Sequence, residues 1–208
     1  MEPFPKRVHV VGLTGGAGTG KSTVAGYLKE MGAAVIEADD VARRIVRRGE
    51  PLLDKIIGEF GSEFLTGEGE LHRGKLADMI FASAEARAKI NSLTHPLMIE
   101  EIHAEINAHQ SRNPQPKAVL IVAAILYEMG LDHCADAVIA LVADRATKLA
   151  RLCERGIPRE RAMKMIDIQT PDALLCRRAQ VVVHTDLPLS ETRRQMEGIW
   201  EKLLVNQP

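Results

Sequence analysis

A glycine-rich loop near the N-terminus restricts the folds open to this chain more than any other part of its sequence. Residues 15–22 read GGAGTGKS, which fits the P-loop pattern of Gly, four residues, and then Gly-Lys-Ser or Gly-Lys-Thr. An apolar, β-branched run at 8–13 precedes the loop, and residues 22–31 carry apolar side chains at helical spacing. The alternative is a glycine-rich turn that fits by chance. The position between a predicted strand and a predicted helix favours a phosphate-binding loop.

Each fixed position of the loop has a physical reason. Glycines allow positive φ angles and bring backbone N–H groups up to phosphate oxygens, and the helix that follows points its positive end at the same charge. Lys21 is expected to reach the β- and γ-phosphates of a nucleoside triphosphate, and the Ser22 hydroxyl is expected to hold Mg²⁺. The predicted nucleotide-binding residues are Gly16, Ala17, Gly18, Thr19, Gly20, Lys21, Ser22 and Thr23.

Strands and helices alternate along much of the chain. Apolar runs at 35–36, 118–126, 137–143 and 181–183 predict further buried strands. We therefore expect an α/β fold, the three-layer sandwich of a P-loop kinase, with helices on both faces of a parallel sheet. The 1–208 chain is predicted to be a single domain with its core at about 7–40, 117–144 and 179–208.

Two mostly helical stretches interrupt this alternation. Residues 41–116 are far longer than a strand-to-strand crossover needs, and a structureless loop of that length would be unusual. A helical, substrate-binding insertion that forms one wall of a cleft is the expected structure. Residues 145–178 also have a helical pattern and carry seven arginines, which predicts a helical lid.

Charge and composition exclude several classes of partner. The 208 residues carry 27 Lys and Arg against 28 Asp and Glu, so the formal net charge is −1 and no global basic field attracts nucleic acid or an anionic membrane. The longest apolar run, 118–126, is too short to cross a bilayer, and the opening residues lack the apolar stretch of a signal peptide. We expect a cytoplasmic monomer or small homo-oligomer with no nucleic-acid or membrane partner.

The residues that follow the loop favour a small-molecule kinase. The chain has neither the guanine-reading Asn-Lys-x-Asp of GTPase switches nor a hydrophobic run that ends in the Asp-Glu pair of motor ATPases. Instead, Asp39 follows the second predicted strand, where its carboxylate could accept the proton of an attacking hydroxyl. Alternatively, Asp39 caps a helix that starts near Val41. Glu37 and Asp40 compete for these roles.

Beyond the loop, the first hundred residues resemble the dephospho-CoA kinase family almost continuously. The matching residues are VGLTGG at 11–16, VIEAD at 35–39, Ala42-Arg43, Gly49-x-Pro51, Phe60-Gly61, Gly69-x-Leu71-x-Arg73, Leu76, Phe81 and Leu93-x-His95-Pro96-Leu97. The resemblance implies a kinase that uses ATP to phosphorylate the ribose 3′-hydroxyl of dephospho-CoA, the last step of coenzyme A synthesis. It also implies a CoA-binding region in the insertion and a mobile lid.

The resemblance assigns roles to individual residues as well. Asp39 matches the family's proposed general base, and two lid arginines match the family's lid pattern best. The implied catalytic residues are Asp39, Lys21, Arg151 and Arg155. The implied acceptor-binding residues are Asp39, Arg43, Arg73 and His95.

Most of these assignments have structural alternatives. His95, which precedes Pro96, could end a helix and pack in the core, and Arg73 could be a solvated residue at a helix start. The lid arginines could decorate exposed helices.

The second half of the chain departs from the family pattern. Where relatives read Pro-Leu-Leu before an aromatic residue and Glu, this chain has AILYE at 124–128, and the lid is one residue short after Arg155. The last predicted strand ends in His184-Thr185 where an Asp-Asn pair is common. These departures concern the adenine contacts and the acceptor wall more than the phosphate chemistry. Two other functions therefore stay open: a P-loop kinase for another small hydroxyl acceptor, such as a nucleoside or nucleotide, and a catalytically weakened ATP-binding regulatory protein.

Overall fold

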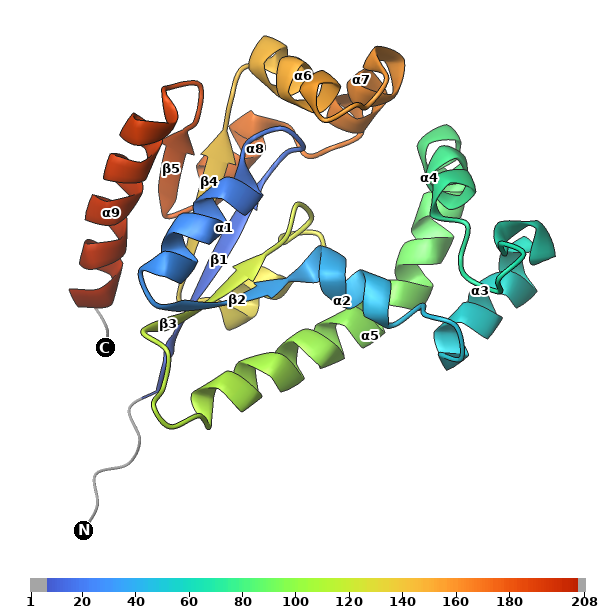
Figure 1. Cartoon of the computed structure of the whole chain (residues 1–208), viewed down its shortest axis with the longest axis horizontal. Helices are drawn as coiled ribbons and strands as arrows, with labels where there is room; N and C mark the ends of the chain where they lie inside the picture. Colours follow the sequence, from blue (N-terminus) through green and yellow to red (C-terminus); the bar gives the residue numbers. More distant parts are fainter. Residues whose placement is uncertain (1–6, 206–208) are drawn as a thin grey trace. The chain divides into compact units, whose positions relative to one another are not determined.

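The computed structural model describes residues 7–205, which form two compact units (Figure 1). Residues 7–37 and 104–205 make up the first unit, and residues 38–103 make up the second. The opening residues 1–6, in which no signal peptide is predicted, and the last three residues of the predicted core lie outside the described residues. No helix within 7–205 is both long enough and apolar enough to span a membrane.

A five-stranded parallel sheet forms the centre of the first unit (Figure 1). Its strand order is β2-β3-β1-β4-β5, and every neighbouring pair is parallel. The strands are β1 (His9–Gly15), β2 (Ala33–Glu37), β3 (Ala118–Val122), β4 (Ala137–Val142) and β5 (Val181–His184). Every residue of the central strand β1 is buried, which explains why its sequence is mostly apolar. The predicted α/β fold with a parallel sheet is therefore confirmed.

Helices cover both faces of this sheet. On one face, α1 (Lys21–Glu30) and α9 (Leu189–Val205) pack together and bury Leu28 and Trp200 against β1 side chains such as Leu13. Because side chains alternate along a strand, Gly12 points to the other face, where Leu126 occupies the space beside it. The helix α8 (Asp172–Arg178) also contacts β1 and β4.

The apolar run at 118–126 is only partly a strand. β3 ends at Val122, and a turn occupies residues 124–130, so the prediction that the whole run is extended is wrong. Leu126 is fully buried all the same, because it packs where Gly12 lacks a side chain. The apolar run therefore predicts correctly that most of these residues are buried, but it does not predict which of them form a strand.

The second unit is mostly helical, as the sequence predicts. It contains α2 (Ala38–Arg44), α3 (Pro51–Phe60), the short 3₁₀ helix η1 (Ser62–Phe64), α4 (Arg73–Ala82) and most of α5 (Ala84–Gln110). The helix α5 runs on through Pro96, so the interpretation that His95 ends a helix is wrong. A proline inside a helix removes one backbone hydrogen bond and crowds the preceding turn, but α5 continues on both sides of Pro96.

The arginine-rich stretch of the first unit folds into three helices, of which α8 is the last. The others are α6 (Arg145–Glu154) and α7 (Arg159–Asp167), which pack against each other. Asp144 caps the start of α6 by accepting the backbone N–H of Thr147 at 2.6 Å. This hydrogen bond lowers the pKa of the Asp144 carboxyl below its usual value.

Candidate active site

The glycine loop connects the end of β1 to the start of α1, as its sequence context predicts. Gly18 and Gly20 have φ angles of +80° and +86°, a backbone conformation that favours glycine. A Cβ atom on Gly18 would lie 2.6 Å from the backbone oxygen of Lys148 in α6. The loop therefore lies directly against α6, at a distance that only glycine permits.

Hydrogen bonds within the loop fix its curvature. The buried Thr19 hydroxyl donates to the carbonyl oxygen of Gly16 at 2.8 Å. The Lys21 ammonium donates to the carbonyl oxygens of Gly15 at 2.7 Å and Gly16 at 3.1 Å. The positive charge of Lys21 is thus held over the first half of the loop, at the positive end of α1.

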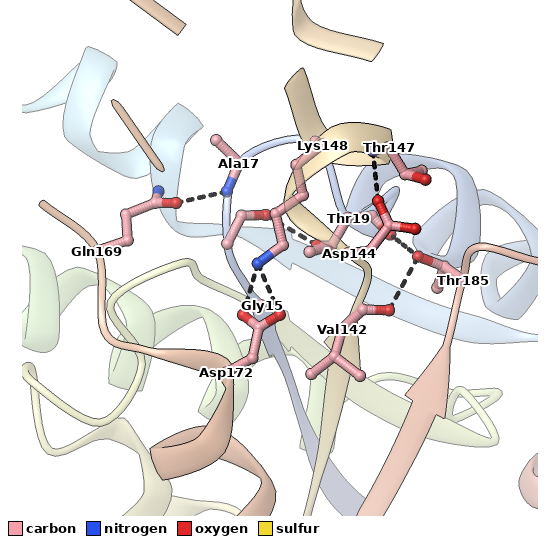
Figure 2. A network of polar contacts seen from close by, with 12 residues as sticks. Gly15, Ala17, Thr19, Val142, Asp144, Thr147, Lys148, Gln169, Asp172 and Thr185 are labelled. Carbon is pink, nitrogen blue, oxygen red and sulfur yellow. Dashed lines mark hydrogen bonds and ion pairs between the residues drawn. The ribbon is translucent and has the colours of Figure 1, made fainter. Parts of the chain in front are cut away.

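Thr185, at the end of β5, ties the loop to the sheet. Its hydroxyl lies 2.9 Å from the carbonyl oxygen of Thr19 and 3.3 Å from that of Val142, and the side chain is buried (Figure 2). Arg151 of α6 donates to this hydroxyl and to the carbonyl oxygen of Gly18. The departure from the family pattern at this position therefore leaves the loop well supported, because threonine supplies these hydrogen bonds.

A cavity of about 260 Å³ opens beside the second half of the loop. We call it the α9 cavity. Its lining comes from residues 18–20 of the loop and the first turns of α1, from Arg151 of α6 and Arg155 at the C-cap of that helix, and from Leu189 and Thr192 of α9. The cavity brings both predicted lid arginines to the loop. The sequence does not predict the α9 wall of this cavity, since no motif marks the residues after β5.

A second cavity, of about 430 Å³, lies beside the first half of the loop and is called the α8 cavity. Gly16, Lys148, Gln169 and Asp172 contribute to its lining. Lys148 is only 8% exposed, and its ammonium donates to both carboxylate oxygens of Asp172, at 2.7 and 2.6 Å. The Gln169 side-chain oxygen accepts the backbone N–H of Ala17 at 2.7 Å (Figure 2). None of these three lid residues was predicted.

The second unit carries the remaining predicted site residues. Asp39 is exposed and lies in the first turn of α2, which begins at Ala38. The interpretation of Asp39 as the cap of a helix near Val41 is therefore wrong, because the helix starts earlier. Asp40 pairs with Arg43 at 2.5 Å.

Two of the predicted acceptor-binding arginines lie together. Arg73 donates to the backbone oxygen of Arg43 at 3.2 Å. Partial burial, followed by the nearby charge of Arg43, lowers the pKa of the Arg73 guanidinium. His95 is half-buried on α5 of the same unit.

The described residues hold no preformed cluster of three or more His, Cys, Asp or Glu side chains that could bind a metal ion. Ser22, the predicted Mg²⁺ ligand, is exposed in the first turn of α1 beside Lys21. A cation there would take most of its oxygen ligands from a bound phosphate and from water, as Mg²⁺ commonly does.

Comparisons with known proteins agree with this arrangement. A sequence model of the family described as dephospho-CoA kinase matches residues 9–191. The dephospho-CoA kinase of Moorella thermoacetica is 37% identical over 197 residues, which cover 94% of this chain and 92% of that protein.

Two solved structures show the same fold. TT1252 from Thermus thermophilus has a TM-score of 0.78 at 25% identity and covers 95% of this chain and 99% of its own. The dephospho-CoA kinase of Campylobacter jejuni has a TM-score of 0.69 at 20% identity, and the match covers 96% of this chain and 98% of that protein. Together with the family match and the P-loop geometry, the sequence identity over almost the full length of the relatives shows that this chain belongs to the dephospho-CoA kinase family.

Proposed function

We propose that this chain transfers the γ-phosphate of ATP to the ribose 3′-hydroxyl of dephospho-CoA, which gives coenzyme A and ADP in the last step of coenzyme A biosynthesis. The observation that carries this proposal is the P-loop with Lys21 seated over it, in a chain that belongs to the dephospho-CoA kinase family. The cavities on the two halves of the loop provide room for the nucleoside and for the reacting end of the triphosphate.

The nucleoside of ATP occupies the α9 cavity in this proposal. Its phosphates then follow the loop, where backbone N–H groups and the positive end of α1 bind their oxygens. Lys21 exchanges the carbonyl oxygens of Gly15 and Gly16 for the β- and γ-phosphates. This exchange suits catalysis because the ammonium is already within the loop and needs only a short movement.

The loop also fits Mg²⁺. Ser22 presents an exposed hydroxyl in the turn where P-loop proteins hold this ion. Ser22, positioned by the first turn of α1, would hold the ion, which would supply positive charge beside the phosphate oxygens.

Asp39 accepts the proton of the attacking hydroxyl in this mechanism. Its exposed carboxylate follows the carboxyl end of β2 by two residues, and parallel strands place their carboxyl ends on one edge of a sheet. Asp40 is a poorer candidate because it already pairs with Arg43. Arg43, Arg73 and His95 contact the acceptor, and Arg151 and Arg155 neutralise charge on the transferring phosphate.

The test is to incubate the pure protein with Mg-ATP and dephospho-CoA and to detect coenzyme A by mass. Lys21→Ala is expected to lower kcat/KM by about 100-fold or more, since it removes a cation from the transition state. Lys29→Ala, in the last turn of the same helix, is the matched control and is expected to have no effect. Near-wild-type transfer by Lys21→Ala would contradict the proposed role of the loop.

A second pair of variants tests whether Asp39 accepts the proton of the attacking hydroxyl. Asp39→Asn keeps the size of the side chain and is expected to lower kcat by about 100-fold or more. Asp40→Asn is the matched control, and it is expected to lower kcat far less. The reverse order of these two effects would move the base from Asp39 to Asp40.

The same assay decides between the other functions that the sequence leaves open. Faster phosphorylation of a nucleoside or nucleotide than of dephospho-CoA would indicate a kinase for that acceptor. ATP binding without any product at saturating acceptor would indicate a regulatory protein.

A further inference from the structure

One side chain of the lid occupies the phosphate-binding loop. Gln169 lies in the connection between α7 and α8, and its side-chain oxygen accepts the N–H of Ala17 at 2.7 Å (Figure 2). The same oxygen lies 3.0 Å from the position that a Cβ atom on Gly16 would take. Backbone N–H groups of a P-loop bind phosphate oxygens, so Gln169 places an oxygen of similar hydrogen-bonding character where a phosphate oxygen binds.

The geometry identifies which phosphate this is. Residues 18–20 line the α9 cavity, whereas Gly16 and Gln169 line the α8 cavity. Lys21, which binds β- and γ-phosphates in P-loops, has its ammonium on the carbonyl oxygens of Gly15 and Gly16. A triphosphate whose nucleoside occupies the α9 cavity therefore directs its terminal phosphate toward Ala17 and Gln169.

The segment around Gln169 is fixed to the loop by a second contact. Asp172, three residues farther along, accepts both hydrogen bonds from the buried Lys148 of α6. The backbone of Lys148 in turn packs against Gly18. These contacts hold the backbone of the segment in place. Only the Gln169 side chain therefore has to rotate to release the N–H of Ala17.

We propose that Gln169 binds the γ-phosphate of ATP. In this structure its side-chain oxygen accepts the N–H of Ala17. When ATP binds, a γ-phosphate oxygen takes that N–H, and the side-chain NH₂ of Gln169 donates to another oxygen of the same phosphate during transfer. The inference rests on the proposed function, since it requires a triphosphate donor. ADP has no group at this position, so only the triphosphate displaces the Gln169 oxygen from the N–H of Ala17.

Gln169→Glu tests the contact by binding alone. The variant side chain has the same shape and still accepts the N–H of Ala17, but its negative charge repels the γ-phosphate. Isothermal titration of the full chain with Mg-ATP and Mg-ADP, without acceptor, is expected to show an ATP Kd raised about tenfold or more and an ADP Kd changed less than about threefold. A purely structural role in the lid would change both constants equally.

Gln180→Glu is the matched control. The Gln180 side-chain oxygen also accepts a backbone N–H at 2.7 Å, from Val138, but it lies away from the loop. This variant is expected to keep the wild-type ratio of ATP to ADP affinity. An unchanged ratio in Gln169→Glu would overturn the proposal.

Gln169→Ala provides a second, kinetic test. The variant loses the hydrogen bond to Ala17 and, in the ATP complex, one to the γ-phosphate, so the ATP Kd is expected to stay within about threefold of the wild-type value. Its kcat is expected to fall about tenfold or more, because a donor to the transferring phosphate is gone. Wild-type kcat in Gln169→Ala would also overturn the proposal. If the wild-type protein makes no coenzyme A, the proposed function fails, whereas the two Kd values still decide the contact with the γ-phosphate.

Discussion

Replacing Gly18 with alanine is expected to destabilise the protein because the loop and the lid helix α6 are in direct backbone contact. Gly18 has a φ angle of +80°. A Cβ atom there would lie 2.6 Å from the backbone oxygen of Lys148 and 2.9 Å from its Cα atom. Both are backbone atoms of a helix, so no side-chain rotation can relieve the overlap, and α6 or the loop has to move.

The magnitude has two parts. Alanine in a left-handed backbone conformation costs about 1–2 kcal/mol relative to glycine. Displacing packed backbone to make room for a methyl group costs about 1–3 kcal/mol more. The free energy of unfolding of Gly18→Ala is therefore expected to fall by about 2–5 kcal/mol, the sum of these two parts.

Urea unfolding without nucleotide measures this effect, and two other glycines calibrate it. Gly20 has a similar φ angle of +86° but nothing within 4 Å of its added Cβ, so Gly20→Ala has only the conformational cost. Gly26 lies in α1 with nothing within 4 Å, so Gly26→Ala is expected to stabilise by about 0.5–1 kcal/mol. Equal losses in Gly18→Ala and Gly20→Ala would refute the contact between the loop and α6.

Two other substitutions test the supports of the loop and the lid. Thr185→Val keeps the side-chain shape but leaves Arg151 and the carbonyl of Thr19 without the Thr185 hydroxyl, so urea unfolding is expected to show a loss of about 1–3 kcal/mol and titration a weaker ATP affinity. Unchanged stability would show that this hydroxyl does not hold the loop. Asp144→Ala removes the carboxylate that caps α6. The hydrogen bond from the Thr147 N–H lowers the pKa of this carboxyl below 3.8, so the wild-type protein is expected to be more stable than the variant above pH 3.8. This difference in stability is expected to disappear as the pH falls through the lowered pKa. Urea unfolding of both proteins across this pH range measures the difference. If Asp144→Ala stays less stable than the wild type in acid, the charged carboxylate is not what stabilises α6.

Local sequence signals predict the loop and the sheet because each depends on neighbouring residues. The glycines of 15–22 specify a backbone path, and the apolar runs specify buried strands whatever the rest of the chain does. The same signals do not separate a buried strand from a buried turn. Leu126 is as apolar and as buried as the residues of β3, and only the space beside Gly12 explains how it is buried although the chain turns there.

The lid residues at the loop could not be predicted in this way. Gln169 meets Ala17 across 152 positions of sequence, and Lys148 meets Gly18 only because α6 crosses the loop. A half-buried glutamine in a helix connection and one lysine among many arginines have no pattern of their own. Leu189 and Thr192 reach the α9 cavity for a similar reason, since the packing of α9 on α1 places them there.

The two lid arginines that the sequence predicts are not equivalent in the structure. Arg151 is half-buried and donates to Gly18 and Thr185, so it stabilises the loop before any phosphate arrives. Replacing Arg151 therefore perturbs loop geometry and transition-state charge together, and a loss of activity would not separate the two. Arg155 is exposed at the end of α6 and lines the α9 cavity. Because its replacement leaves the contacts of Gly18 and Thr185 in place, a fall in kcat for Arg155→Gln at unchanged stability would report on a contact with the bound nucleotide and not on loop geometry.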